Sequence, residues 1–172
     1  MPTELIRKHE LEALLKNLAS IKATAETLRL QAQTFTEESE AEFIEGTNFK
    51  RKLDGMPQAT KNIVDKTSKL AVKLNKTDTT TEVLKEIYTD LLLLETVIQK
   101  LNIALNALRQ DELKVIELRY FEGLAWIGIA DEFLVSKATA QRLRSEALNK
   151  MRVVARIAID DYNKIMKILN LN

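Results

Sequence analysis

The sequence predicts an all-α protein with a long N-terminal helical hairpin or coiled-coil bundle and a C-terminal domain of short helices followed by an extended last helix. Only four glycines and two prolines interrupt 172 residues, of which 45% are hydrophobic and 30% charged, a composition typical of helix-rich soluble proteins. Two long stretches repeat apolar residues at alternating steps of three and four, which is the spacing of a helical seam. Between residues 108 and 151, shorter amphipathic segments are separated by tight joints.

The first seam begins near the N-terminus and lasts for more than three heptads. Its members are Leu11, Leu14, Leu18, Ile21, Ala25, Leu28, Ala32 and Phe35. Thr3 is a candidate N-cap for this helix. A seam of this length needs a partner surface, so the pattern predicts a coiled coil or one arm of a helical hairpin.

An irregular loop is predicted over about residues 36–58. The stretch from Thr34 to Glu45 holds five glutamates and no basic residue, and Gly46, Gly55 and Pro57 interrupt the residues after it. A weaker amphipathic helix over residues 59–75 comes next.

The pattern Thr79-x-x-Glu82 then predicts a capping box, in which hydroxyl and carboxylate satisfy first-turn amides reciprocally. Residues 76–78 would break the preceding helix and the capping box would start a new one. A continuous helix through this point is the alternative.

The second seam is the cleanest pattern in the sequence. Its members are Leu84, Ile87, Leu91, Leu94, Ile98, Leu101, Leu105 and Leu108. Leu92, Leu93 and Val97 widen the apolar stripe, which favours a bundle over an isolated two-stranded coil. The first helix or a second chain can supply the partner surface. We therefore expect residues 1–107 to form an oligomerisation or partner-binding domain, in a homodimer or higher oligomer.

Residues 108–172 are expected to form the C-terminal domain. One helix is predicted from Asp111 to Tyr120, ending at residues 121–123, and a second from Leu124 to Phe133. After a joint at residues 134–135, Ser136 is a good N-cap for a third helix. This is the geometry of a helix-turn-helix, whose second crossing helix enters the DNA major groove. The bulky Phe121, Trp126 and Phe133 are expected in the core.

The third helix has an inward stripe and a polar outer face. The inward stripe consists of Ala140, Leu143, Ala147 and Met151. The outer face carries Lys137, Ala138, Thr139, Gln141, Arg142 and Ser145. Arginine reads guanine and glutamine reads adenine through paired hydrogen bonds, so Gln141 and Arg142 are the best base-reading candidates. Arg144 lies beside the inward stripe and is either a phosphate contact or the partner of an acidic residue.

Several segments of this domain resemble region 4 of sigma-70 family transcription factors. They are Leu118–Gly123, Ile129-Ala130, Val135-Ser136 and Arg144–Met151, against a family pattern of roughly LRY-x-EG, EIA, xS-x-x-TV and R-x-x-x-AL-x-K-[LM]. The resemblance implies DNA contacts at Ser136, Lys137, Thr139 and Arg142. With its long helical N-terminal half, the whole chain is similar in architecture to phage and prophage late-gene regulators of the RinA/ArpU type.

Three positions depart from the region 4 pattern. Gly128 stands where the family usually has Glu, Leu134 where the turn usually has Gly, and Ala140 where a β-branched residue is usual. These departures bear on the geometry of the turn more than on the fold.

Other function classes find little support. The chain has no Cys and a single His, His9, so neither a thiolate nor a histidine-rich metal site is expected. It has no Gly-rich phosphate loop and no Ser/His or Cys/His arrangement, so we expect no enzyme, no catalytic residue and no cofactor. No apolar run approaches the roughly 18 residues of a membrane span, and no membrane partner is expected.

The sequence therefore predicts a sequence-specific regulator of transcription that binds double-stranded DNA in the cytoplasm of a bacterial host. RNA polymerase is a second candidate partner. From residue 137 onward there are eight Lys or Arg against three Asp or Glu, and a basic face attracts phosphates through counterion release. A DNA-binding assembly protein such as a small terminase subunit, and a module that binds RNA polymerase or a sigma factor, are the alternatives.

Overall fold

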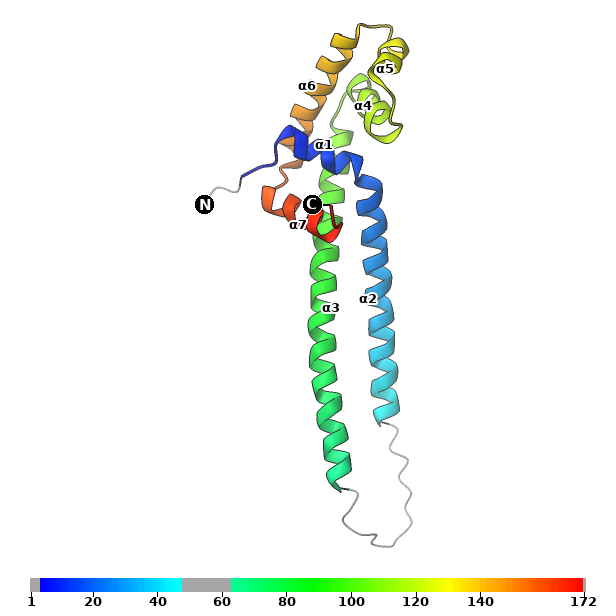
Figure 1. The fold of residues 1–172 in the computed structure, drawn as a ribbon, viewed down its shortest axis with the longest axis vertical. Helices are drawn as coiled ribbons and strands as arrows, with labels where there is room; N and C mark the ends of the chain where they lie inside the picture. Colours follow the sequence, from blue (N-terminus) through cyan, green and yellow to red (C-terminus); the bar gives the residue numbers. More distant parts are fainter. Residues whose placement is uncertain (1–3, 48–62, 172) are drawn as a thin grey trace. The chain divides into compact units, whose positions relative to one another are not determined.

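The computed structural model describes residues 4–47 and 63–171, and over these residues the protein is all-α, as predicted (Figure 1). The helices are α1 (Lys8–Lys16), α2 (Leu18–Thr47), α3 (Ile63–Asn106), α4 (Gln110–Ile116), the π-helical turn η2 (Glu117–Phe121), α5 (Trp126–Glu132), α6 (Lys137–Ala155) and α7 (Ile159–Ile168).

The first seam is buried as predicted, but it belongs to two helices. Its buried members are Leu11, Leu14, Leu18, Ile21, Ala25 and Ala32. The helix is interrupted at Asn17. The side-chain amide of Asn17 donates a hydrogen bond to the carbonyl of Ala13 at 2.9 Å and competes with the backbone hydrogen bonds of the helix. Helix α1 begins after Arg7, whose backbone N–H donates to the Glu10 carboxylate, and the candidate cap Thr3 lies outside the described residues.

The predicted loop over residues 36–58 is wrong for its first part, because α2 continues to Thr47. The acidic stretch remains helical since alanine and glutamate are good helix formers. The Thr34 and Thr36 hydroxyls donate to carbonyls of the preceding turn, which keeps both side chains compatible with the helix. Residues 48–58 lie outside the described residues.

The predicted helix start at Thr79 is also wrong. Helix α3 runs through this point without interruption, which is the alternative that the sequence left open. No Gly or Pro lies between Ile63 and Asn106, and a short run of threonines costs too little helix propensity to stop a long helix. In the second seam Leu91, Leu94, Leu101 and Leu105 are buried, as is Val97, whereas Leu92 is 66% exposed.

Two compact units divide the chain. One contains residues up to Glu26 together with residues from Leu92 on, and the other contains Thr27–Leu91. Helix α1 therefore shares a unit with the C-terminal helices, and the domain boundary at residue 107 stays a prediction. The assignment of residues 1–107 to oligomerisation or partner binding stays a prediction.

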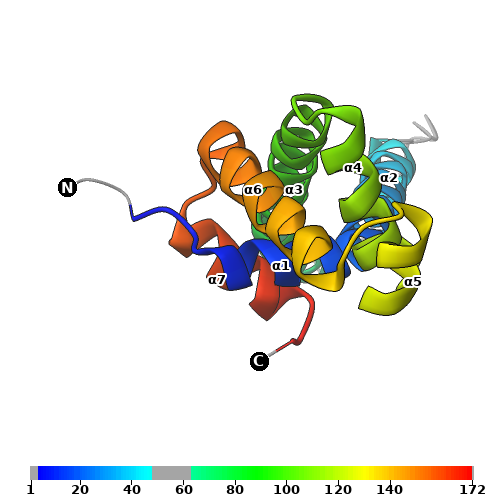
Figure 2. The same cartoon turned by 90° about the horizontal axis from the view of Figure 1, so that it is seen from above.

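The N-terminal segment pairs with the connection between α6 and α7. Helix α6 ends where Arg156 adopts a left-handed conformation (φ 44°), and the chain then turns into α7. The Ile6 N–H donates to the Ile157 carbonyl at 3.1 Å, and the Ile159 N–H donates to the Glu4 carbonyl at 2.9 Å. Ile6 and Ile157 are fully buried, and Figures 1 and 2 show α7 beside α1. The start of α7 and the connection before it are thus joined to the N-terminal segment of the same chain.

Candidate nucleic-acid interface

A small apolar core holds α4, η2, α5 and α6 together. Val115, Leu118, Ile129 and Ala140 are buried in it, and Leu124, Trp126, Phe133 and Leu143 pack against it half-buried. Trp126 and Phe133, which were predicted in the core, pack against its edge and are partly buried. Phe121 is not a core residue, because 47% of it is exposed. It is the last residue of the π-helical turn η2, and the wider turn changes the helical spacing on which its predicted burial was based.

Two left-handed residues make the joints of this domain. Gly123 (φ 73°) follows η2, and Leu134 (φ 52°) lies between α5 and α6. The turn at Leu134 is closed by hydrogen bonds from the Leu134 N–H to the Asp131 carbonyl and from the Val135 N–H to the Ala130 carbonyl. A leucine in this conformation costs about 1 kcal/mol, but its side chain is 92% exposed and meets no obstacle. The departure from Gly at this position therefore leaves the tight turn intact.

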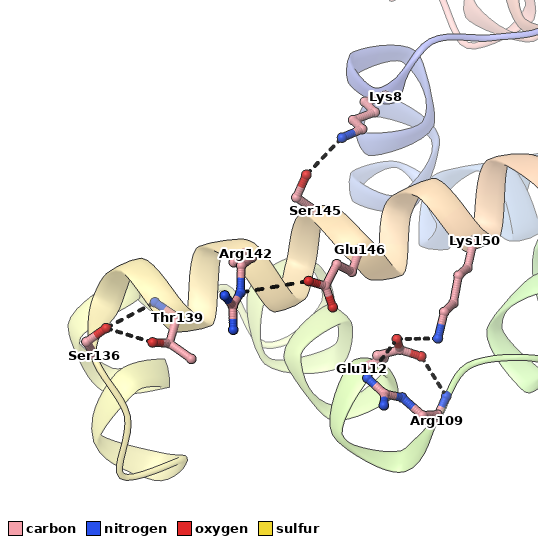
Figure 3. A network of polar contacts seen from close by, with 9 residues as sticks. All are labelled: Lys8, Arg109, Glu112, Ser136, Thr139, Arg142, Ser145, Glu146 and Lys150. Atoms are coloured by element: carbon pink, nitrogen blue, oxygen red, sulfur yellow. Dashed lines mark hydrogen bonds and ion pairs between the residues drawn. The ribbon is translucent and has the colours of Figure 1, made fainter.

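Ser136 caps α6 as predicted. Its Oγ accepts a hydrogen bond from the Thr139 backbone N–H at 3.1 Å and lies 2.8 Å from the Thr139 Oγ1 (Figure 3). The cap fixes the direction in which the helix leaves the turn. It also engages two hydroxyls that the sequence suggested as DNA contacts, and both residues remain exposed.

Loss of this cap has a measurable cost. Ser136→Ala should lower the free energy of unfolding by about 1 kcal/mol, because an amide in the first turn of α6 loses its acceptor. Urea denaturation followed by circular dichroism measures the change. Ser136→Asp is the control: its carboxylate can accept the same hydrogen bond, so it should retain most of the stability. Equal losses in the two variants would contradict the capping role.

The N-terminal turns of α6 are open to solvent. Lys137, Ala138, Thr139, Gln141 and Arg142 are all exposed, while Ala140, Ala147 and Met151 are buried and Leu143 is half-buried. The inward stripe predicted from the sequence is therefore confirmed. The Arg142 Nε lies 3.8 Å from the Glu146 Oε1, with 77% and 50% of these side chains exposed. Such an exposed pair is weak, so the guanidinium can exchange Glu146 for another partner.

The other two candidate contacts, Arg144 and Ser145, meet α1, which packs against α6 and η2. The Arg144 Nη1 lies 3.5 Å from the Glu12 Oε1, so of its two predicted roles the structure places it as the partner of an acidic residue. The Ser145 Oγ accepts a hydrogen bond from the Lys8 Nζ at 2.8 Å (Figure 3). Sequence patterns carry no sign of these contacts, because 137 positions separate Lys8 from Ser145.

Two guanidinium groups flank the ring of Trp126. The Arg119 Cζ lies 4.9 Å from the ring centroid and the Arg144 Cζ 5.4 Å, distances at which cation–π attraction operates. The Arg119 Nη1 also donates to the Leu124 carbonyl at 2.9 Å, which ties η2 to the first joint. Nearby, burial raises the pKa of Tyr120 to about 12, and the charge of Glu12 contributes in the same direction. Tyr120 is therefore a neutral phenol at physiological pH.

Glu112 ties α4 to the C-terminal half of α6. It is fully buried, and its Oε1 accepts hydrogen bonds from the Lys150 Nζ at 2.5 Å and from the Arg109 Nη2 at 3.2 Å. Its Oε2 accepts from the Arg109 backbone N–H at 2.9 Å. Burial by itself would raise the pKa of Glu112, but the hydrogen bonds from Lys150 and Arg109 outweigh it and lower the pKa. The carboxylate is thus charged and fixes how α6 crosses α4.

The N-terminal half of α6 is exposed and basic, and its C-terminal half is packed against other helices of the protein. A DNA-binding helix-turn-helix has the same arrangement. Residues 104–153 match the family model described as Sigma-70, region 4. The region 4 segment, as we call these residues, extends from the end of α3 through most of α6. The match confirms the resemblance to region 4 and indicates a DNA-binding helix-turn-helix. No curated protein and no solved structure matched the chain. Among the helices that the structure describes, none is both long and apolar enough to cross a membrane.

Proposed function

We propose that the protein is a sequence-specific regulator of transcription, encoded by a phage or prophage, that acts at promoters through its region 4 segment. The observation that carries this proposal is the exposure of Lys137, Gln141 and Arg142 on α6 while the opposite face of the helix is buried. The architecture similar to late-gene regulators of the RinA/ArpU type supports the phage assignment. The function proposed is binding, with no catalytic step.

In the proposed complex, the first turns of α6 lie in the major groove. Arg142 releases Glu146 and donates two hydrogen bonds to a guanine, and Gln141 pairs with an adenine. Lys137, Ser136 and Thr139 meet the phosphates or base edges that border the helix N-terminus. The short Ala138 allows α6 to approach the base pairs closely and can contact a thymine methyl group.

The proposed setting is the cytoplasm of a bacterial host, with RNA polymerase as a second partner of the region 4 segment. We also propose a homodimer or higher oligomer, since many helix-turn-helix proteins bind two half-sites. Light scattering of the full chain distinguishes these assemblies. A dimer agrees with a regulator that binds a two-part operator, whereas ring-sized oligomers would favour a DNA-packaging assembly protein.

Selection of bound sites from random duplex DNA tests the DNA-reading function. The wild type should enrich a defined site. Arg142→Ala and Gln141→Ala should each lose base preference at one position, with about tenfold weaker binding to the selected site, because a bidentate contact discriminates by about 1–3 kcal/mol.

Lys164→Ala is the charge-matched control for Arg142→Ala, since it removes one exposed positive charge from α7 and should leave the selected site unchanged. Equal weakening of binding to every sequence by Arg142→Ala would contradict base reading and make Arg142 a phosphate contact. Failure of the wild type to bind any duplex at low salt would overturn the proposed function in favour of a protein-binding module.

A further inference from the structure

Helix α1 places a positive charge on the outer face of α6. The Lys8 side chain reaches across from α1 and donates to the Ser145 hydroxyl (Figure 3). Ser145 follows Gln141 by four positions and Arg142 by three, and residues at these spacings lie on one face of a helix, about 5–6 Å apart. The hydroxyl that Lys8 contacts therefore belongs to a residue about one helical turn along α6 from the two base-reading candidates. Lys8 comes from a part of the chain far outside the region 4 segment.

The charge of Lys8 is also not paired with a carboxylate. Three cations on α6 do have acidic partners: Arg142 pairs with Glu146, Arg144 with Glu12 and Lys150 with Glu112. The partner of Lys8 is a neutral hydroxyl, and no Asp or Glu oxygen lies within 4.0 Å of its nitrogen over the part of the chain whose contacts are described. Contact with an anion therefore stabilises Lys8 more than it stabilises the neighbouring cations that already have a carboxylate partner.

The location of Lys8 is fixed by packing. Leu11, Leu14 and Leu15 of α1 are at most 1% exposed, so the helix is anchored along its apolar face. The ion pair between Glu12 and Arg144 joins α1 to α6 one turn beyond Lys8. Little conformational entropy remains to be lost when Lys8 meets a ligand, which favours binding at this place.

We propose that α1 is part of the DNA interface and that Lys8 contacts a backbone phosphate at the rim of the groove that α6 enters. This inference rests on the proposed function. A lysine is a compact point charge suited to a phosphate oxygen. Base edges lie on the floor of the groove and phosphates along its rim, so a side chain that approaches α6 from its flank meets the rim. Such a contact positions the protein on the duplex without reading sequence.

The salt dependence of DNA binding by the full chain tests the proposal. Affinities for the selected duplex and for an unrelated duplex are measured by fluorescence anisotropy over a series of salt concentrations. Lys8→Ala should reduce the slope of log affinity against log salt by about 0.9, the value for one phosphate contact on duplex DNA. It should weaken binding to both duplexes by the same factor, roughly fivefold to tenfold near 0.1 M salt, and leave the selected sequence unchanged.

Three further variants separate a phosphate contact from other roles of Lys8. Lys16→Ala removes the same charge from an exposed position on the same helix and should keep the wild-type slope. Ser145→Ala removes the hydroxyl that holds Lys8 but keeps the charge, so its slope should also be retained. Lys8→Arg should restore most of the slope that Lys8→Ala loses.

If the wild type binds DNA and Lys8→Ala keeps the wild-type salt dependence, the proposal for Lys8 is wrong and the proposed function is unaffected. Equal losses in Lys8→Ala and Lys16→Ala would overturn it as well, since they would indicate a general charge effect. The same loss in Ser145→Ala would make Lys8 a brace for α6 instead of a phosphate contact. Absence of wild-type binding to any duplex would overturn the proposed function itself, so the two failures are distinguishable.

Discussion

Ile129→Ala should lower the free energy of unfolding of the C-terminal domain by about 3 kcal/mol. Ile129 is fully buried in the cluster with Val115, Leu118 and Ala140, where α4, α5 and α6 meet. Truncation to alanine removes its apolar contacts and leaves a cavity in a core too small to collapse around it. Urea denaturation followed by far-ultraviolet circular dichroism measures the loss.

Ile127 provides a matched control on the same helix. The residue type is identical, but Ile127 is 69% exposed, so Ile127→Ala should change the free energy of unfolding by less than about 0.5 kcal/mol. Similar losses in the two variants, or a loss below about 1 kcal/mol for Ile129→Ala, would contradict the packing described for α5.

Glu112→Gln should cost about 2 kcal/mol of unfolding free energy at neutral pH. The substitution keeps the size of the side chain but replaces a charged acceptor of three hydrogen bonds by an amide, whose NH2 group cannot accept one. Lys150 and Arg109 would then lack a negatively charged partner, and one of the two acceptor oxygens would be lost. Both cations are about half exposed and can recover part of their solvation, which keeps the cost below that of a wholly buried pair.

The pH dependence of stability distinguishes this network from simple packing. The pKa of Glu112 is lower in the folded protein than its ordinary value of 4.5. A carboxyl with a lowered pKa stabilises the fold above its ordinary pKa, and this contribution is lost as the pH falls through the folded value. The wild type should therefore lose its advantage over Glu112→Gln as the pH falls below 4.5. Glu122→Gln, at an exposed position, is the control for loss of a carboxylate. A difference in the free energy of unfolding between wild type and Glu112→Gln that stayed constant down to pH 2 would contradict the role of the Glu112 charge.

The helix-turn-helix could be predicted in detail because its signals are local. The cap at Ser136, the joint at residues 134–135 and the inward stripe of α6 all depend on residues within a few positions of one another. Helical spacing also identified the buried members of both seams, since burial of an apolar stripe follows from its period. Local pattern failed at Phe121, where a π-helical turn changes the period, and at Thr79, where a good capping pattern occurs inside a continuous helix.

The contacts made by α1 could not be predicted. Lys8 and Glu12 lie at the start of the first seam, whose pattern indicates only a helix, and nothing in that pattern says which distant helix it meets. The break at Asn17 releases α1 from the axis of α2 and makes its packing on α6 possible. Base-reading roles for Gln141 and Arg142 stay predictions, whereas Arg144 shows how a cation on the same helix can serve the protein's own packing instead.

The distance along the chain between α1 and α6 has a consequence for biosynthesis. At about 5–20 residues per second, a ribosome needs roughly 7–27 seconds to add the 137 residues that separate Lys8 from Ser145. Throughout that interval the chain has α1 but not the complete surface on which α1 docks. Docking of α1 on α6 therefore follows the synthesis of α6, and a nascent chain that stalls before α6 leaves Leu11, Leu14 and Leu15 without part of the surface that buries them.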